Sequence, residues 1–597
     1  MFKTIILLLF LIYSNSLILP YLWKYLPQLN DYNSNGSNIN NLIPIISPND
    51  LPNFQKINSR LFNPFKDYSS ISNYNLLNPY YITIENFNLQ SNFKPFQIFP
   101  YKLISRDLFE NWITNQFEIS FDNMLKNLGD LTLNPDLIQN QSVAIGAVVA
   151  SRSKIQPDYF YQWIRDGAIT INSIINHLNE FDLYQNKTLR LTVENYLDNS
   201  YNLQRTDNPT GKFDPLDLSS LGEPKFLVDS TPFKRVWGRP QNDGPGLRII
   251  TISNFLKHLK IWNLELLGTD KNIFQSTRDV YFKIIKLDLK FIIKHWADKH
   301  FDLWEEIDSH HFFTALTQLK ALKIGIKLFE QFNDDELEFF NQLNQEYNRL
   351  LEYIEKDSGF IDYNLNHIIE TPSILDKRSG LDAAILIGSL LTHDDLEEDF
   401  PFDVNEGLIL NTLSEMIKTM KYIYPINHNR INLNLGIALG RYPEDLYDGI
   451  RINEGNPWFL TTISASELLY KLISKLYNDE KDLIIDSKNQ HFYFNNIIEV
   501  NKIVQFNDPK FLFQSYNNVI LTIPYNSLAF NQTAKNLLDF ADSFLDVIRE
   551  HVGDDGSMSE QFNKYTGFMQ GAEDLTWSYG SFWNAFRWRQ RALKFIN

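Results

Sequence analysis

The stretch FDLWEEIDSHHFFTALTQLKALKIGIKLF, residues 301–329, joins an acidic loop to an apolar segment. Within this segment Leu319, Leu322, Ile326 and Phe329 recur at intervals of three and four residues. This spacing places the four side chains on one face of a helix, as in a helix that packs against a core. The stretch therefore predicts a buried helix that begins soon after a cluster of carboxylates.

Similar amphipathic patterns follow one another along the chain from about residue 106 onward. No alternation of strands with helices accompanies them, which argues against an α/β fold. About a dozen helices are expected, so the fold class is all-α, with helices paired around a common centre. Besides the helix near 319–329, the predicted helical segments are 107–127, 166–179, 189–203, 246–266, 275–297, 335–355, 380–392, 408–423, 459–477, 537–548 and 577–594. The region 487–523 carries strand-like runs and is interpreted as an insertion.

Three parts of the chain are expected. Residues 1–20 are predicted to be a signal peptide, because Lys3 is followed by the apolar run 5–13 and then a polar break. Residues 21–105 are rich in Asn, Pro and Ser and predict an irregular arm or linker. Residues 106–597 form the helical domain.

The N-terminus also bears on the compartment. Pro20 and Lys24 interrupt the apolar run before it reaches the roughly 20 residues of a membrane span, so no stable span is expected. Secretion is the interpretation favoured, with a vacuolar or a wall- or membrane-tethered protein as alternatives. Sequons at Asn35, Asn140 and Asn186, together with a fourth at Asn531, are compatible with secretion.

Composition excludes several classes of function. The formal net charge is −17, which disfavours a nucleic-acid partner, because such a partner requires a basic surface. The chain has no cysteine, so it has neither a disulfide framework nor thiolate chemistry. Aromatic residues make up 14% of the chain, which suits either a large core or the flat faces of sugars.

Two acidic stretches, far apart in sequence, are candidates for chemistry. In the first, Asp302, Glu305 and Glu306 surround Trp304. A carboxyl group held against an indole has a raised pKa and can act as a general acid, although acids also commonly begin helices. The second is GSMSEQFNKYTG, residues 556–567, which contains Glu560.

Five loops between the predicted helices place Trp or Tyr beside Arg, Asp or Glu. Aromatic faces can stack on a sugar while charged groups hydrogen-bond its hydroxyls, so these loops predict one shared polar pocket. The loops are PDYFYQWIRDGA (157–168), VWGRPQNDGPGLR (236–248), FDLWEEIDS (301–309), GRYPEDLYDG (440–449) with NPWFL (456–460), and GSMSEQFNKYTG with DLTWSYG (574–580).

Two carboxylates on separate loops suit glycoside hydrolysis, in which one donates a proton and the other attacks or activates water. Glu305 and Glu560 are the candidates, and Asp302 and Glu306 compete for the acid role. No GxSxG motif is present. The histidines lack metal-ligand spacing, so neither a metal nor a cofactor is expected, and they are interpreted as loop or helix-surface residues. These histidines are His295, His300, His310 and His311.

The chain resembles the fungal and yeast glucoamylases of glycoside hydrolase family 15 over roughly residues 107–597. The resemblance lies in YQWIRD, GEPKFLVD, WGRPQNDGP, DLWEE, GRYPEDLY, NPWFL, SMSEQ and DLTWSYG, in that order. It implies an (α/α)6 barrel for a catalytic domain at 106–597. It also implies exo-acting hydrolysis of α-1,4 bonds, and more slowly of α-1,6 bonds, from the non-reducing ends of starch, glycogen and malto-oligosaccharides. The product would be β-D-glucose, released with inversion.

The resemblance also implies residue roles. Glu305 corresponds to the general acid and Glu560 to the general base that activates water. The implied substrate-binding residues are Tyr159, Trp163, Arg165, Asp166, Trp237, Asp302, Trp304, Glu306, Arg441, Trp458 and Trp577. The expected partner is an α-glucan and the expected state is a monomer. The alternatives are a related (α/α)6 hydrolase with another linkage preference and a catalytically inactive glucan-binding protein.

Overall fold

The computed structural model describes residues 105–362, 364–394, 396, 398–433, 435–498 and 521–596. The predicted signal peptide, nearly all of the predicted arm and the sequon at Asn35 lie outside these residues. Residues 100–597 form one compact unit.

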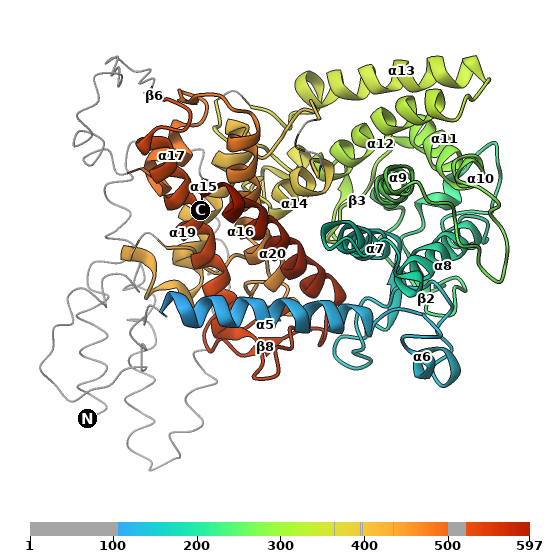
Figure 1. Ribbon diagram of the computed structural model, residues 1–597, viewed down its shortest axis with the longest axis horizontal. Helices are drawn as coiled ribbons and strands as arrows, with labels where there is room; N and C mark the ends of the chain where they lie inside the picture. The colour runs from blue at the N-terminus through green and yellow to red at the C-terminus, as the bar shows by residue number, and fades with distance from the viewer. Residues whose placement is uncertain are drawn as a thin grey trace, which may run out of the picture. The chain divides into compact units, whose positions relative to one another are not determined.

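Within the described residues, contacts between helices define a closed inner ring of six helices, which are labelled in Figure 1. Each packs against the next in chain order, and the last packs against the first. The inner helices are α7 (Ile164–Glu180), α9 (Asp243–Trp262), α12 (Phe312–Gln331), α14 (Ala383–Thr392), α16 (Phe459–Asn478) and α20 (Thr576–Ile596).

Six outer helical segments surround this ring, and each precedes its inner partner in the chain. They are α5 (Arg106–Leu125), α8 (Lys187–Gln204), the continuous segment from α10 (Thr277–Val280) through η6 (Tyr281–Ile285) to α11 (Lys286–His295), α13 (Leu337–Glu352), α15 (Gly407–Ile423) and α19 (Leu528–His551). The alternation of outer and inner helices is that of an (α/α)6 barrel, so the all-α prediction is confirmed. The predicted helices match the observed ones to within a few residues, apart from the starts of α12 and α19.

Short two-stranded sheets decorate the loops. They are β1 (Tyr161–Trp163) with β2 (Lys225–Leu227), β3 (His300–Phe301) with β4 (Asp308–Ser309), β5 (Leu483–Ile485) with β6 (Leu521–Ile523), and β7 (Gln561–Phe562) with β8 (Met569–Gln570). The strand-like pattern near residue 490 proved misleading. The segment forms helix α17 (Gln490–Asn496), because Phe492 and Tyr493 pack into the core as neighbours on a helix.

The helices of the barrel begin in different ways. Side-chain oxygens of Ser105, Asn186 and Ser527 accept hydrogen bonds from first-turn N–H groups of α5, α8 and α19, as N-caps commonly do. Among the inner helices, α7 and α16 have Trp163 and Trp458 at the N-cap, and neither indole caps the helix. These two inner helices therefore begin at a tryptophan in place of a capping side chain.

Buried ion pairs tie the two rings of helices together. Arg248 of α9 donates to Asp288 of α11 at 2.8 and 2.6 Å, and both side chains are almost fully buried. Arg589 of α20 donates to Asp542 of α19 and to Glu110 of α5. Removing one partner of such a pair typically costs about 3–5 kcal/mol, so these contacts help to fix how the helices pack.

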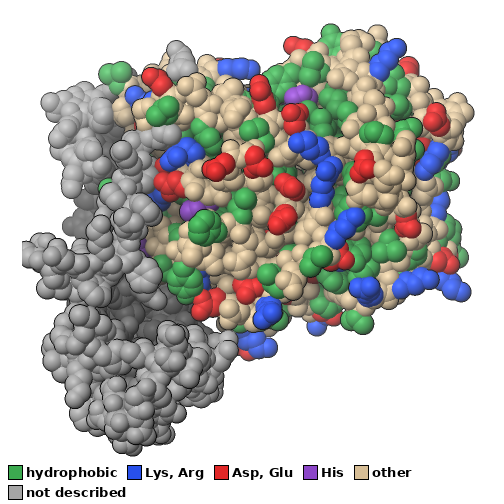
Figure 2. Space-filling view, turned by 90° about the horizontal axis from the view of Figure 1, so that it is seen from below, with side chains coloured by type: hydrophobic (Ala, Val, Ile, Leu, Met, Phe, Trp, Pro, Cys, Tyr) green, Lys and Arg blue, Asp and Glu red, His purple; other side chains and the backbone are tan. Residues whose placement is uncertain are grey.

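The surface carries both signs of charge. On the face drawn in Figure 2, Lys and Arg side chains are interspersed with Asp and Glu. Within the described part of the chain, no helix is both long and apolar enough to cross a membrane.

Candidate functional site

The first turns of the inner helices converge at one end of the barrel. Arg165 in the first turn of α7 donates to Asp243 in the first turn of α9 at 3.0 Å, and its guanidinium lies 6.0 Å from the ring of Trp577 in α20. Asp382 at the N-cap of α14 accepts a hydrogen bond from the indole of Trp304 at 2.9 Å. The aromatic and charged loops predicted from sequence therefore meet in one place.

Glu305 lies in the loop between β3 and β4 and adopts a left-handed backbone conformation, with φ +66°. Its Oε1 accepts hydrogen bonds from Trp163 Nε1 at 2.6 Å and from Gln241 Nε2 at 2.9 Å. Arg165 Nη2 lies 3.9 Å from the same oxygen, and the Glu305 side chain is 18% exposed. A non-glycine residue with positive φ is uncommon and concentrates at functional sites.

Asp302 organises the same loop from within. Its Oδ1 accepts from the backbone N–H groups of Glu306 and Ile307, both at 2.7 Å, and its Oδ2 accepts from that of Trp304 at 3.2 Å. Burial raises the pKa of Asp302 despite these hydrogen bonds. Because its carboxylate is taken up by the backbone, Asp302 is poorly placed to act as the acid.

His311 lies just before α12 and His300 lies in β3, and both are almost fully buried, so neither is the surface histidine that was expected. The Nε2 of His311 lies 2.9 Å from the carbonyl oxygen of Ile307 and 3.0 Å from that of His300, and its Nδ1 lies 2.8 Å from Thr371 Oγ1. His311 therefore joins the two arms of the Glu305 loop. Its role was hidden in sequence because the carbonyl groups it contacts can be identified only after folding.

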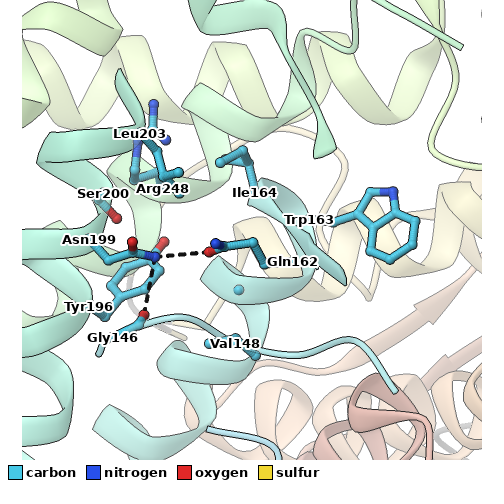
Figure 3. A pocket seen from close by; sticks show the side chains of 11 residues that line it. Gly146, Val148, Gln162, Trp163, Ile164, Tyr196, Asn199, Ser200, Leu203 and Arg248 are labelled. Atoms are coloured by element: carbon cyan, nitrogen blue, oxygen red, sulfur yellow. Dashed lines mark hydrogen bonds between the residues drawn. The ribbon is translucent and has the colours of Figure 1, made fainter. Parts of the chain in front are cut away.

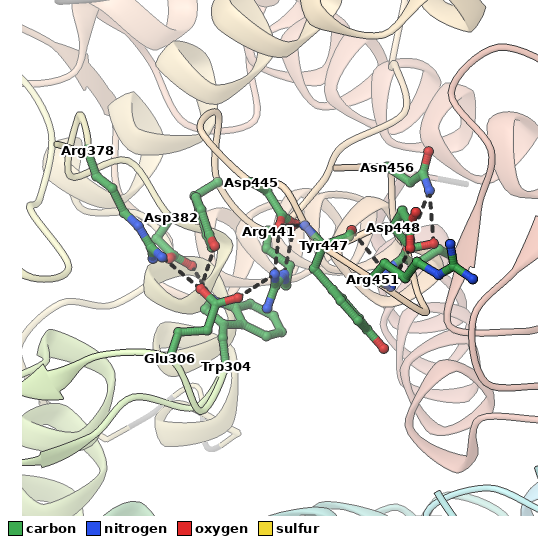
Figure 4. Close-up of polar contacts among 12 residues, drawn as sticks. Trp304, Glu306, Arg378, Asp382, Arg441, Asp445, Tyr447, Asp448, Arg451 and Asn456 are labelled. Atoms are coloured by element: carbon green, nitrogen blue, oxygen red, sulfur yellow. Dashed lines mark hydrogen bonds and ion pairs between the residues drawn. The ribbon is translucent and has the colours of Figure 1, made fainter. Parts of the chain in front are cut away.

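Glu306 points toward Arg378 and Arg441 (Figure 4). Its Oε1 accepts from Arg441 Nη2 at 2.7 Å, and its Oε2 accepts from Arg378 Nη2 at 2.7 Å and from the Tyr442 hydroxyl. Burial acts to raise the pKa of Glu306, but Arg441, Tyr442 and Arg378 outweigh it and hold the pKa below the ordinary value. Arg441 is itself fixed by Asp445 through two hydrogen bonds of 2.8 and 2.6 Å.

Aromatic rings line the wall between these groups. The Trp304 and Trp458 rings lie 5.5 Å apart at an interplanar angle of 60°, and the Arg441 guanidinium lies 5.3 Å from each. Burial raises the pKa of Asp382, which supports Trp304, to about 8. The predicted site residues Trp304, Trp458 and Arg441 are thus brought together.

Glu560 is 1% exposed, and its Oε2 has no hydrogen-bond partner among the described residues. Burial raises its pKa to about 8, while Arg441 and the Tyr159 hydroxyl partly oppose this rise. Gly571, at φ +78°, lies directly against the carboxylate: a Cβ built on this glycine would come within 2.4 Å of Glu560 Oε2. A buried, strongly perturbed carboxyl beside a pocket is typical of a catalytic group.

Tyr159 packs beside Trp163, and the centroids of the two rings lie 5.6 Å apart. The Tyr159 hydroxyl lies 3.0 Å from that of Tyr447. Burial, the charge of Glu560 and, less strongly, the charge of Glu305 raise the pKa of Tyr159 well above its ordinary value. Tyr159 therefore lies close to both Glu305 and Glu560, which are 255 residues apart in sequence.

The pair Arg165 and Asp166 forms the floor of the site. Arg165 Nε and Asp166 Oδ2 lie 3.4 Å apart, and neither atom has a hydrogen-bond partner in the described part of the chain, although both are buried. Burial raises the pKa of Asp166 to about 6, against the opposing charge of Arg165. Buried polar atoms left in this state are suited to the hydroxyl groups of a bound ligand.

Lys225 is a residue of the site that sequence reasoning missed. It is 1% exposed, and its Nζ lies 3.5 Å from the ring centroid of Trp237, 4.2 Å from that of Trp163, 4.1 Å from that of Tyr161 and 4.5 Å from that of Phe233. Burial lowers the pKa of Lys225 to about 8, while the charge of Glu305 opposes the fall. Its place in GEPKFLVD was the available signal, since that stretch is one of those that carry the resemblance.

Gln241 is a second residue that was missed. Its side chain accepts from Arg165 Nη1 and donates to Glu305 Oε1, both at 2.9 Å, so it bridges Arg165 and Glu305. It is present in the WGRPQNDGP stretch, but only the folded structure reveals the bridge. Trp237, predicted from the same stretch, has its ring centroid 6.2 Å from that of Trp163.

A small cavity lies behind Trp163, between α7, α8 and α9 (Figure 3). Gln162 Oε1 accepts from Asn199 Nδ2 at 2.9 Å on its wall, and Gly167 and Tyr196 line it. Trp163 lines this cavity, whereas Glu305 and Glu560 do not.

The structure thus brings all the predicted site residues to one end of the barrel. Within the described ranges, no group of three His, Cys, Asp or Glu side chains is arranged to hold a metal ion.

Comparison with known proteins gives concordant results. Residues 125–587 match the family model for glycosyl hydrolases family 15. The chain is 41% identical to an intracellular sporulation-specific glucoamylase of Saccharomyces cerevisiae, over 81% of this chain and 85% of the relative. It is also 41% identical to glucoamylase GLU1 of Saccharomycopsis fibuligera, over 82% of this chain and 92% of the relative. A solved glucoamylase structure from Saccharomycopsis fibuligera superposes with a TM-score of 0.75 at 40% identity, covering 81% of this chain and 96% of that one.

Proposed function

Because the chain belongs to glycosyl hydrolases family 15, we propose that it hydrolyses terminal α-1,4 bonds, and more slowly α-1,6 bonds, of α-glucans from the non-reducing end. The product is β-D-glucose, released with inversion. The observations that carry this proposal are the two carboxyls: Glu305, whose Oε1 accepts from Trp163 and Gln241, and Glu560, which is almost fully buried. An inverting hydrolase needs two such groups with room for water between them.

In this mechanism Glu305 protonates the leaving oxygen and Glu560 activates water. The carboxylate of Glu560 accepts the proton of that water. Because Glu560 is buried, its carboxylate is a stronger base when it is ionised. The Arg165–Asp166 pair and Arg441 hold the terminal glucose by its hydroxyls, while Tyr159 and Trp163 border the same glucose.

The remaining site residues have supporting roles. Glu306 accepts from the next sugar, and Asp302 holds the loop of Glu305. The rings of Trp237, Trp304, Trp458 and Trp577 form walls for the sugars. A pocket built on helix N-termini at one end of a barrel suits a chain end.

A second assignment of the two carboxyls follows from the burial of Glu560. Burial raises the pKa of Glu560 to about 8, which favours the protonated form of that carboxyl, whereas Glu305 Oε1 accepts hydrogen bonds from two N–H groups. In this reading Glu560 is the acid and Glu305 is the base. The two readings predict opposite behaviour toward a substrate that needs no proton on its leaving group.

α-Glucosyl fluoride distinguishes these readings, because fluoride departs with little help from an acid. In the first reading, Glu305→Gln abolishes maltose hydrolysis but largely retains fluoride hydrolysis, and Glu560→Gln abolishes both. The reverse pattern would exchange the roles. Proton NMR of fresh maltotriose digests supplies the stereochemistry. Early β-glucose supports inversion, early α-glucose contradicts it, and no glucose directs attention to other linkages.

We further propose a monomer in which residues 106–597 are the catalytic domain and residues 21–105 are an arm. Secretion is supported by the apolar run at 5–13. The relative named as intracellular and sporulation-specific supports the alternative of retention inside the cell. Sequencing the N-terminus of the purified native protein tests the predicted loss of about 20 residues.

A further inference from the structure

Arg378 occupies the rim of the site, in the loop between η8 (Pro372–Ile374) and α14. Its Nη2 donates to Glu306 Oε2 at 2.7 Å, and its guanidinium lies 3.9 Å from the ring centroid of Tyr442. The side chain is 20% exposed. Stacking on Tyr442 holds the plane of the guanidinium, so the hydrogen bond to Glu306 has a fixed direction.

The Glu306 carboxylate is nearly saturated with donors. An ionised carboxylate offers about four acceptor directions, two on each oxygen. Arg378 and Tyr442 occupy both directions on Oε2, and Arg441 occupies one on Oε1. One direction on Oε1 remains, and the side chain is 26% exposed, so a ligand can reach it. The single free acceptor direction of Glu306, on Oε1, is therefore fixed by the donors on the other three.

We propose that Arg378 is a positioning residue that sets the specificity of the site for the sugar on the leaving side of the cleaved bond. It does so by turning the free acceptor of Glu306 toward a hydroxyl of that sugar. The inference rests on the proposed hydrolase function and extends it. Glu305 faces the wall of Trp163 and Glu306 faces the wall of Arg378, so the two carboxylates serve different parts of the substrate.

Without Arg378, Glu306 keeps its partners Arg441 and Tyr442. It loses the donor that fixes the second direction on Oε2, and the carboxylate can then rotate about its last bond. A hydroxyl bound through Oε1 would be held less tightly. A substrate that has no sugar on the leaving side would not be affected, because Glu305 and its partners Trp163 and Gln241 are untouched.

Arg378→Gln tested on two substrates separates these effects. Maltose has a sugar on the leaving side, whereas α-glucosyl fluoride has only fluoride there. We expect kcat/KM for maltose to fall about tenfold, mainly through a higher KM, because the lost interaction is one of binding. We expect kcat/KM for α-glucosyl fluoride to change less than twofold.

Two further variants control for charge and folding. Arg378→Lys keeps the charge and one donor but not the planar fork, so it should recover part of the maltose activity. Arg451 is exposed on a neighbouring loop, and its side chain forms no ion pair within the described residues (Figure 4). Arg451→Gln removes one positive charge there and should leave kcat/KM unchanged for both substrates. Thermal unfolding of each variant establishes that it is folded.

Each other outcome contradicts the inference. An equal loss on both substrates would show that Arg378 supports the whole loop, including Glu305, and not the leaving-side sugar. No loss on either substrate would show that Arg441 and Tyr442 suffice for Glu306. An equal effect of Arg451→Gln would show that only the charge matters. A wild-type enzyme that cleaves neither substrate would instead overturn the proposed function.

Discussion

Glu305 and Glu306 are consecutive in the chain, yet opposite walls of the barrel hold their carboxylates. Glu305 accepts from Trp163 on the α7 side, and Glu306 accepts from Arg441 and Arg378 on the α14 and α16 side. The left-handed backbone of Glu305, with φ +66°, accompanies this divergence. One loop thereby supplies two acids to two different positions.

Asp302 is expected to keep that loop in shape. Asp302→Asn replaces one acceptor oxygen by an NH2 group, so at least one of the three backbone N–H groups it serves faces a donor. Leaving a buried donor unsatisfied costs about 1–3 kcal/mol. We expect a lower melting temperature and roughly tenfold lower activity. Asp308→Asn, an exposed change in β4 of the same hairpin, is the control and should be neutral.

Gly571 is expected to be required for the placement of Glu560. In Gly571→Ala the new Cβ would lie 2.4 Å from Glu560 Oε2, so the carboxylate must move and activity should fall at least 100-fold. Gly268→Ala is a matched control, since Gly268 also has positive φ, at +84°, but a Cβ there meets nothing within 4 Å. The control should lose only about 1–2 kcal/mol of stability from backbone strain and should keep full activity. Equal activity in both variants would contradict this role.

The difference in stability between Glu560→Gln and the wild type should depend on pH. The folded-state pKa of Glu560 is about 8, above the ordinary 4.5, so the native state binds an extra proton between these values. The stability that this group contributes is present below about pH 4.5 and is lost as pH rises through 8. Glutamine mimics the protonated acid, so the variant should match the wild type near pH 4. It should be more stable at pH 8, by on the order of a few kcal/mol.

In Glu306→Gln the stability difference from the wild type should have the opposite sign, so this variant serves as the control for that experiment. The folded-state pKa of Glu306 is lowered, so its contribution to stability is present above the ordinary pKa and is lost as pH falls. This variant should be less stable than the wild type at pH 7, and the difference should shrink in acid. Thermal unfolding of both variants at several pH values measures the two trends. Parallel trends would contradict the burial argument for Glu560.

The cavity behind Trp163 offers a stabilising change. Gly167 lies within helix α7. In Gly167→Ala the new Cβ would meet Tyr196 at 3.5 Å and Val148 at 3.8 Å, which are ordinary van der Waals distances. Replacing a helical glycine by alanine typically gains about 0.5–1 kcal/mol. Gly244→Ala is the contrasting variant, because its Cβ would lie 2.9 Å from Ile164 Cγ2. Urea unfolding should show a higher midpoint for the first variant and a lower one for the second.

The sequence by itself determined the class of fold and named candidates for the site, although it missed Lys225 and Gln241. Apolar residues at intervals of three and four mark each helix, because this local period places them on one helical face whatever lies around it. The loops with Trp163, Glu305, Arg441 and Glu560 were recognisable because each combines residue types that a core does not need. The site residues were named without knowing how far apart they lie.

The tertiary structure alone decided which atoms meet. Glu305 and Trp163 are 142 residues apart, and nothing local to either predicts their hydrogen bond. The enclosure of Lys225 by four rings and the link from His311 across the Glu305 loop likewise depend on contacts between separate segments. The spacing of apolar residues along a helix follows from the geometry of the local backbone. The partners and the burial of each side chain follow from how the whole barrel closes.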